Sequence, residues 1–400
     1  MSKFVINKLI HKICIMFPAI YLIGTMLSDS IGRILAQLMI LLLFVAILLE
    51  SNRKRVSSLV FVVLFVLINA IQFGVYYVAH QDFYGFIFLI LMLLYYRDTK
   101  KICKIEEILI NKSFGKKVIV IFYLCLLFSL IFGEGLRVSF DWGVKIPMLY
   151  GPFALPHTLA YLLLAIYAMS SILLRCKRER VYFVFMVLSF VCIIWTGVRS
   201  VLVVSLLMVF LDFVTMKSVS KKMVVFLVGT MVLVYLLLFT DIITQNPVVQ
   251  KTLIALGKGS GITNSRTDFN SYVLEGYWDM GIVDKIFGIG MDGLRKYMCL
   301  RYGTEIHAHN DFLNSLAGMG FVGLCMFVIY MYKFCGQFKV IKTTIVSICL
   351  LAILAYTNGL FMYIGFIPCI PVTMVYSKAL FVDKKKTMGE QNAEVVVQQT

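Results

Sequence analysis

The sequence predicts an all-α integral membrane protein of about 12 transmembrane helices, with both termini in the cytoplasm and one large extracytoplasmic loop before the tenth helix. Three observations lead to this prediction. Of the 400 residues, 60% are apolar and only 15% are charged, which is unlike a soluble domain. Many apolar runs approach the roughly 20 residues that a helix needs to cross a bilayer. Basic residues gather in every second segment between these runs, which places most of them on one side of the membrane.

The apolar runs set the order of the expected spans along the chain. Hydrocarbon offers no partner to backbone N–H and C=O groups, and the runs lack the roughly ten-residue alternation of barrel strands, so each run is expected to be a helix. We expect spans near residues 13–28, 31–49, 58–78, 83–96, 118–133, 154–174, 181–196, 200–216, 223–240, 313–332, 343–359 and 361–377.

The basic residues orient these spans. With Lys3, Lys8 and Lys12 in the cytoplasm, most of the 38 lysines and arginines fall in cytoplasmic segments, including the strongly basic stretch 97–117. The net charge of +17 therefore follows from membrane orientation. No basic patch remains that would indicate a nucleic-acid partner.

The chain divides into four parts on this scheme. Residues 1–240 hold the first nine helices, 241–312 form the large extracytoplasmic loop, 313–380 hold the last three helices and 381–400 form a polar cytoplasmic tail. A loop of this length is too long for a simple connector. Its half-apolar stretch 268–283 is expected to form an amphipathic helix on the outer membrane surface.

Titratable residues are concentrated where this loop re-enters the membrane. Glu305, His307 and His309 are followed by Asn310 and Asp311, either of which could cap the next helix and turn its N-terminal N–H groups toward an anion. These histidines and carboxylates are also zinc or manganese ligand types. However, two histidines at this spacing share a face only in an extended strand, so we expect no metal. The alternative is a helix start whose histidines merely face water.

Two arginines on the outer side are candidates for binding an anion. Arg199 lies at the junction of two apolar helices, where a guanidinium is costly unless it faces protein or a polar cavity. Arg266 precedes the amphipathic stretch. Snorkelling to the interface and an ordinary surface charge are the respective alternatives.

Glycines form two further patterns near the histidines. Gly320 and Gly323 should lie on one side of the tenth helix and permit the close approach of a neighbour. Residues 288–293 match GxGxxG, but no strand–turn–helix unit surrounds them, so we interpret them as a glycine-rich turn and not as a dinucleotide site.

Together these motifs resemble the O-antigen ligase and polymerase-like family of bacterial membrane glycosyltransferases. His309-Asn310 followed by Gly320-x-x-Gly323 fits the ligase pattern His-Asn-x9-Gly-x-x-Gly, at the point where the large outer loop of that family re-enters the membrane. Four further parts of the sequence are similar to landmarks of the family: Thr196-Gly-Val-Arg199, Ser265-Arg266, Trp278 and Phe287-Gly-x-Gly290. Where ligases often continue with two threonines, this chain has Leu324-Cys325, so a polymerase is the first choice and a ligase the second.

The resemblance implies glycan transfer from an undecaprenyl diphosphate carrier to a sugar hydroxyl at the outer face of the bacterial cytoplasmic (inner) membrane. His309 is the first candidate for the base, followed by His307 and Glu305, and Arg199 and Arg266 would bind the diphosphate. Because the donor carries its own leaving group, no cofactor is expected. The products would be O-antigen, capsule or exopolysaccharide, and flippase and chain-length regulator proteins would be partners. A transporter of lipid-linked oligosaccharide is the main rival, but its charges would be expected at mid-membrane.

Overall fold

The computed structural model describes residues 3–50, 53–74, 81–133, 135–141, 144–215, 246–257, 266–303 and 309–381. The expected span 223–240, the polar tail from 382 onward, Glu305 and His307 lie outside them. The first half of the described chain contains α1 (Lys3–Leu27), α2 (Asp29–Leu48), α3 (Arg53–Phe73), α5 (Gln81–Tyr95), α6 (Thr99–Ile110), η1 (Asn111–Ser113), α7 (Phe114–Ile131), β1 (Leu136–Asp141), β2 (Val144–Leu149), α8 (Pro156–Lys177), α9 (Arg180–Trp195) and α10 (Arg199–Thr215). The second half contains α13 (Pro247–Gly257), α14 (Arg266–Asp279), α15 (Ile282–Phe287), α16 (Met291–Tyr302), α17 (Asp311–Cys335), α18 (Ile341–Thr357), η2 (Ile367–Cys369) and α19 (Ile370–Phe381).

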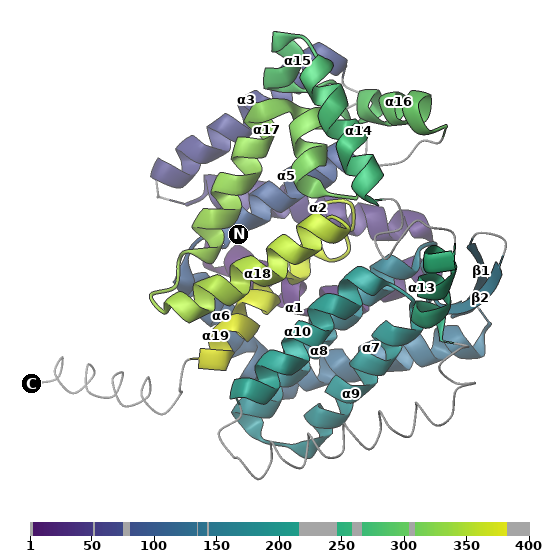
Figure 1. The fold of residues 1–400 in the computed structure, drawn as a ribbon. Helices are drawn as coiled ribbons and strands as arrows, with labels where there is room; N and C mark the ends of the chain where they lie inside the picture. Colours follow the sequence, from purple (N-terminus) through teal and green to yellow (C-terminus); the bar gives the residue numbers. More distant parts are fainter. Residues whose placement is uncertain are drawn as a thin grey trace, which may run out of the picture.

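The predicted helical membrane architecture is found in the described part of the chain (Figure 1). Six described helices are long and apolar enough to cross a bilayer, and four more are apolar but shorter. Of the most apolar stretch of α8, 83% of residues are buried inside the protein, against 22% for α3. Helix α8 is therefore the central helix, packed by α7, α9, α10 and α19, whereas α3 lies at the periphery.

Three elements differ from the sequence prediction. Residues 136–149, expected as part of a loop, form an antiparallel hairpin in which Leu136 pairs with Leu149, and this is the one departure from an all-α fold among the described residues. Residues 99–110, expected as a cytoplasmic loop, form the amphipathic helix α6. The last span begins at η2 and α19, and not at 361, because Pro368 and Pro371 lack N–H donors and are tolerated only near a helix start.

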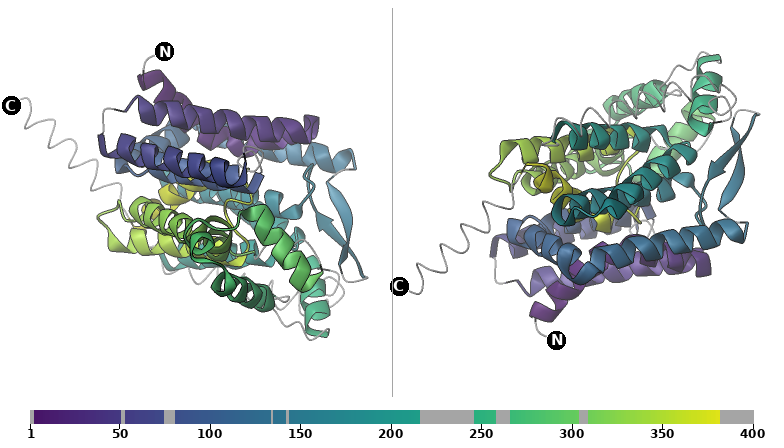
Figure 2. Two further views of the ribbon diagram at one scale, coloured as in Figure 1. Left: turned by 90° about the horizontal axis from the view of Figure 1, so that it is seen from above. Right: turned by 90° about the horizontal axis from the view of Figure 1, so that it is seen from below.

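The two ends of the bundle are distinct. The start of α1 and the end of α19 lie at one end, and the β1–β2 hairpin lies at the other (Figure 2). At the hairpin end, α14, α15 and α16 pack against α17 (Figure 1). The predicted amphipathic helix is therefore present as α14, but its apolar face packs on protein: Phe269 and Val273 contact a small core with Leu294, Met298 and Ala317.

A buried ion pair at the opposite end fixes α8 against α10. Arg175 donates through Nη2 to Asp212 Oδ1 at 2.6 Å, and Tyr167 and Ser171 donate to the same carboxylate at 3.0 and 2.8 Å. Arg199, the first residue of α10, lies at the other end of this helix.

Candidate active site

His309 lies directly before the N-terminus of α17. Its backbone is in the left-handed region, with φ of 50°, which side-chain-bearing residues adopt only at a cost of about 1–2 kcal/mol. Asn310 then returns to an extended conformation, and its Oδ1 accepts hydrogen bonds from the N–H groups of Phe312 and Leu313 at 3.0 and 3.4 Å. The helix therefore begins abruptly after the half-buried His309. Of the two predicted cap residues, Asn310 is the cap.

Asp311 has a structural role instead. It is fully buried, and its Oδ2 accepts hydrogen bonds from the N–H groups of Leu360 and Phe361, the latter at 3.3 Å. Tyr161 of α8 donates to the carbonyl of Gly359 at 2.7 Å. These contacts tie the start of α17 to α8 through the segment that follows α18. We suggested Asp311 as a helix cap or metal ligand; its carboxylate instead holds this segment in place.

Aromatic rings pack against one another at the start of α8, beside the segment that follows α18. The ring of Tyr363 stacks on Tyr161 at a centroid distance of 4.7 Å and on His157 at 5.5 Å. Sequence reasoning missed all three residues. The available signal was a histidine at the first turn of an outer helix start, in Pro156-His157.

The backbone of a loop segment crosses α17 closely about two turns after the start of the helix. Gly320 has φ 74° and ψ −178°, so α17 is interrupted there. The turn 288–290 fills the interruption: Ile289 N donates to Ala317 O at 3.1 Å and Gly290 N donates to Gly318 O at 2.9 Å. A Cβ on Gly320 would lie 2.2 Å from Ile286 O, and one on Gly288 would lie 2.4 Å from Gly318 O.

This crossing corrects one prediction and confirms another. Gly320 does not share a regular helix face with Gly323, because the helix is broken at Gly320. The Gly288–Gly290 segment is a turn between α15 and α16, as predicted, and it carries no strand–turn–helix unit among the described residues. The large loop is further anchored where Arg295 Nη2 donates to the buried Asp82 Oδ2 at 2.5 Å.

Arg199 is the first residue of α10, at the same end of the bundle. The chain reaches it through Gly197, whose φ is 68° and whose Cβ position lies 3.1 Å from Pro247 and 3.3 Å from Met148 of the hairpin. Thr196 Oγ1 accepts a hydrogen bond from Val198 N at 3.4 Å. A tight turn against β2 and α13 therefore precedes Arg199 at the start of α10. Helices α10 and α17 both pack against α18.

The remaining predicted residues are only partly described. Arg266 is the first residue of α14, and Glu305 and His307 lie outside the described residues. Within the described ranges, no group of three or more His, Cys, Asp or Glu side chains is arranged to hold a metal ion. The structure thus brings His309 and Asn310 together with Asp311, Tyr161 and the 359–361 segment.

Such an arrangement provides the parts that a transfer reaction needs. His309 lies directly before a helix N-terminus, where backbone N–H groups and the helix dipole favour an anion. A guanidinium begins a second helix at the same end of the bundle. An imidazole can accept a proton from a hydroxyl, and a guanidinium can compensate the charge of a phosphate.

Comparison with known proteins agrees with the motifs. The family model described as "O-Antigen ligase" matches residues 184–328, a range that contains Arg199, Arg266, His309, Gly320 and Gly323. No curated protein and no solved structure matches the chain. Residues 184–328 are therefore similar to the O-antigen ligase family, which confirms the predicted resemblance of the chain to the O-antigen ligase and polymerase-like family.

Proposed function

We propose that the protein is a polysaccharide polymerase that joins undecaprenyl-diphosphate-linked repeat units at the outer face of the bacterial cytoplasmic membrane. The observation that carries the proposal is the position of His309 directly before the capped N-terminus of α17, inside the matched range 184–328. Leu324-Cys325 at the end of the glycine motif favours a polymerase over a ligase.

In the proposed reaction, the acceptor sugar hydroxyl attacks the anomeric carbon of the donor glycan. Its proton passes to His309 as the new C–O bond forms. The bond between the anomeric carbon and the diphosphate oxygen breaks, and undecaprenyl diphosphate leaves with the electron pair. Arg199 and Arg266 compensate the charge that develops on the diphosphate, and the proton on His309 is then released to water.

The base is tested with His309→Ala in a strain that lacks the chromosomal copy of the gene. Surface polysaccharide is separated by gel electrophoresis, and membrane levels of the protein are measured by immunoblot. We expect loss of long-chain polysaccharide at normal protein levels. Gly257→Ala is a control, because it changes the same large loop at the end of α13, where a Cβ would meet nothing within 4 Å and the backbone is not left-handed. Polysaccharide of unchanged length in His309→Ala would rule out a base at this position.

The diphosphate role of Arg199 is tested with a pair of substitutions. Arg199→Ala should shorten or abolish the chains, and Arg199→Lys should retain part of the activity because it keeps the charge but loses the bidentate geometry. Arg137→Ala is the matched control, since Arg137 lies on the hairpin at the same end, 5.8 Å from the ring centroid of Tyr150. Equal effects of the Arg199 and Arg137 substitutions would indicate a general charge effect and contradict the proposed role.

A ligase is the second candidate, because the matched family model is described as a ligase. The deletion strain separates the two activities. Loss of a polymerase leaves a single repeat unit on the acceptor, whereas loss of a ligase leaves none. A single-repeat band would support the polymerase, and an acceptor without any repeat would replace it with the ligase.

A further inference from the structure

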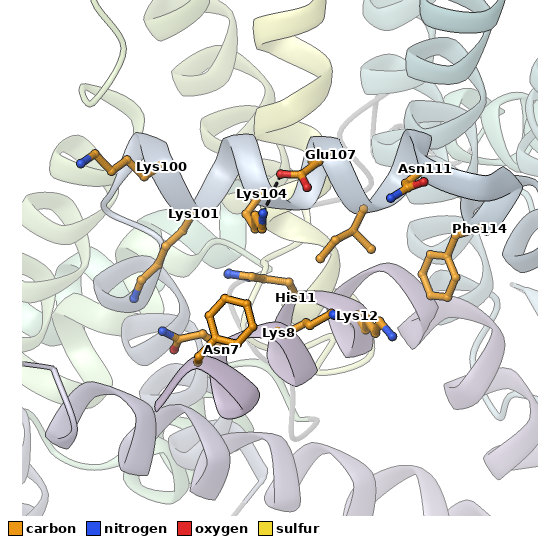
Figure 3. A pocket seen from close by; sticks show the side chains of 12 residues that line it. Asn7, Lys8, His11, Lys12, Lys100, Lys101, Lys104, Glu107, Asn111 and Phe114 are labelled. Atoms are coloured by element: carbon orange, nitrogen blue, oxygen red, sulfur yellow. Dashed lines mark hydrogen bonds and ion pairs between the residues drawn. The ribbon is translucent and has the colours of Figure 1, made fainter. Parts of the chain in front are cut away.

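A cavity of about 560 Å³ lies at the opposite end of the bundle, between α1 and α6. It is far along the chain from the matched range 184–328, and the proposed glycan transfer does not use it. In Figure 3, Lys101 of α6 extends toward α1, and Asn7 and His11 of α1 lie opposite. The cavity is lined by Phe4, Asn7, Lys8, His11, Lys12, Lys100, Lys101, Lys104, Glu107, Ile108, Asn111 and Phe114.

The charge in this cavity is strongly unbalanced. Five lysines line it, and Glu107 is the only acidic residue of the lining. Glu107 accepts from Lys104 at 2.7 Å, and Lys101 pairs with Glu50 outside the cavity. Among the residues that the structure describes, Lys8 and Lys12 make no ion pair. Like charges that face one hollow repel each other, so an anion inside it would be stabilised.

Orientation in the membrane explains the side on which these lysines lie, but not their convergence. The positive-inside rule requires basic residues on the cytoplasmic side and places no condition on how they are arranged there. Here the lysines come from two helices about 90 residues apart in the chain, Lys8 and Lys12 on α1 and Lys101 and Lys104 on α6. Packing of α1 against α6 gathers them around one cavity.

The wall of the cavity is held by specific contacts. Tyr95 donates to Asn7 Oδ1 at 2.7 Å, and His11 Nδ1 lies 2.9 Å from the hydroxyl of Tyr96. Lys101 Nζ lies 3.3 Å from the ring centroid of Tyr95. The exposed Phe4, with the other apolar lining residues, adds an apolar edge beside the cationic groups. This combination fits a phosphate with an attached apolar chain, as at other basic pockets on the cytoplasmic side of membrane proteins.

We propose that this cavity binds the phosphate group of an anionic ligand, with the headgroup of an acidic phospholipid of the inner leaflet as the favoured source. The lysine ammonium groups contact the phosphate oxygens, and Phe4 contacts the first part of the acyl chains. A free phosphate ion shares the same chemistry and is distinguished by experiment.

The test uses the full-length protein in detergent with two probes, short-chain phosphatidylglycerol and inorganic phosphate, and calorimetry measures the dissociation constant of each. The pocket variant combines Lys8→Gln, Lys12→Gln and Lys104→Gln. The control variant combines Lys116→Gln, Lys177→Gln and Lys342→Gln. It removes the same charge at the same end of the bundle and, like the pocket variant, breaks one exposed ion pair, because Lys116 pairs with Glu179. Short-chain phosphatidylcholine, at the same concentration, controls for partition of lipid into the micelle.

We expect phosphatidylglycerol binding to weaken roughly 100-fold in the pocket variant and to stay within about twofold in the control. Tight binding of phosphatidylglycerol with weak binding of phosphate identifies the lipid as the ligand, and the reverse identifies the free ion; either result with the pocket dependence supports the site. Equal weakening in both variants, or no weakening in the pocket variant, would overturn the proposal. None of these outcomes depends on glycan transfer.

Discussion

Substitution of Gly320 by alanine should release the 286–290 segment from α17. The new Cβ would lie 2.2 to 2.5 Å from Ile286 O, Ile286 C and Gly288 N, all backbone atoms that no rotamer change can move. An alanine at φ 74° and ψ −178°, a region that essentially only glycine adopts, costs about 1–3 kcal/mol. Separation of the two backbones also breaks the hydrogen bonds of Ile289 N and Gly290 N, worth about 1 kcal/mol each or more where the groups stay buried. We expect a loss of roughly 3–5 kcal/mol for this part of the molecule.

The assay for Gly320→Ala is thermal unfolding of the purified protein in detergent, together with the length of surface polysaccharide. Gly303→Ala is the control for a positive φ alone: Gly303 has φ 77° and ψ 2°, in the milder left-handed helical region, and a Cβ there meets nothing within 4 Å. The two variants therefore differ by the crossing and by the rarer backbone conformation at Gly320. If both shift the melting temperature equally, the contact between 286–290 and α17 contributes no stability and our argument is wrong.

Three further predictions concern Asp311 at the start of α17, the ion pair between α8 and α10, and Lys101 in the basic cavity. Asp311→Leu should strand two buried N–H groups at about 1–3 kcal/mol each, whereas Asp311→Asn keeps an acceptor; urea or thermal unfolding that ranks the two variants equally would contradict this. Arg175→Ala should cost roughly 3–5 kcal/mol because it leaves Asp212 buried without its cation, while Lys116→Ala, in an exposed pair, should cost under about 1 kcal/mol in the same unfolding assay. Burial lowers the pKa of Lys101 to about 8, although the nearby Glu50 carboxylate acts in the opposite direction. This amine should therefore lose its proton and become reactive as the pH rises through about 8, which site-resolved reductive methylation measures. A pH profile like that of an ordinary lysine, with a pKa of about 10.4, would refute the prediction.

How far the sequence predicts the site depends on whether a signal is local. Asn310 could be recognised as a cap because capping involves only the next three residues. The turn at Gly288–Gly290 was recognised for the same reason. His309 and Arg199 were identified from motifs whose order along the chain carries the resemblance. Each of these signals lies within a short window of sequence.

Contacts between distant segments could not be read in this way. The hydrogen bonds from Leu360 and Phe361 to Asp311 join residues about 50 positions apart in the chain. Neither segment contains a sequence pattern that indicates the other. Gly320 looked like a helix-packing residue because its spacing from Gly323 fits a helix face; the interruption of α17 depends on the turn at Gly288 that fills it. The hairpin 136–149 was missed because each strand has only six residues and is ordered by pairing with the other.

The sequence by itself determined the chemical inventory of this protein, and it predicts the apolar solvent and the orientation in the membrane. A bilayer requires long apolar helices, and lysines are retained on its cytoplasmic side. Apolar length and lysine position can both be read directly from the residues in each segment. Only the tertiary structure decided which groups meet: Asp311 with 360–361, the loop glycines with the broken α17, and the lysines of α1 with those of α6. These encounters depend on which helices pack together, and that choice is made by shape complementarity over whole faces, which no short window of sequence contains.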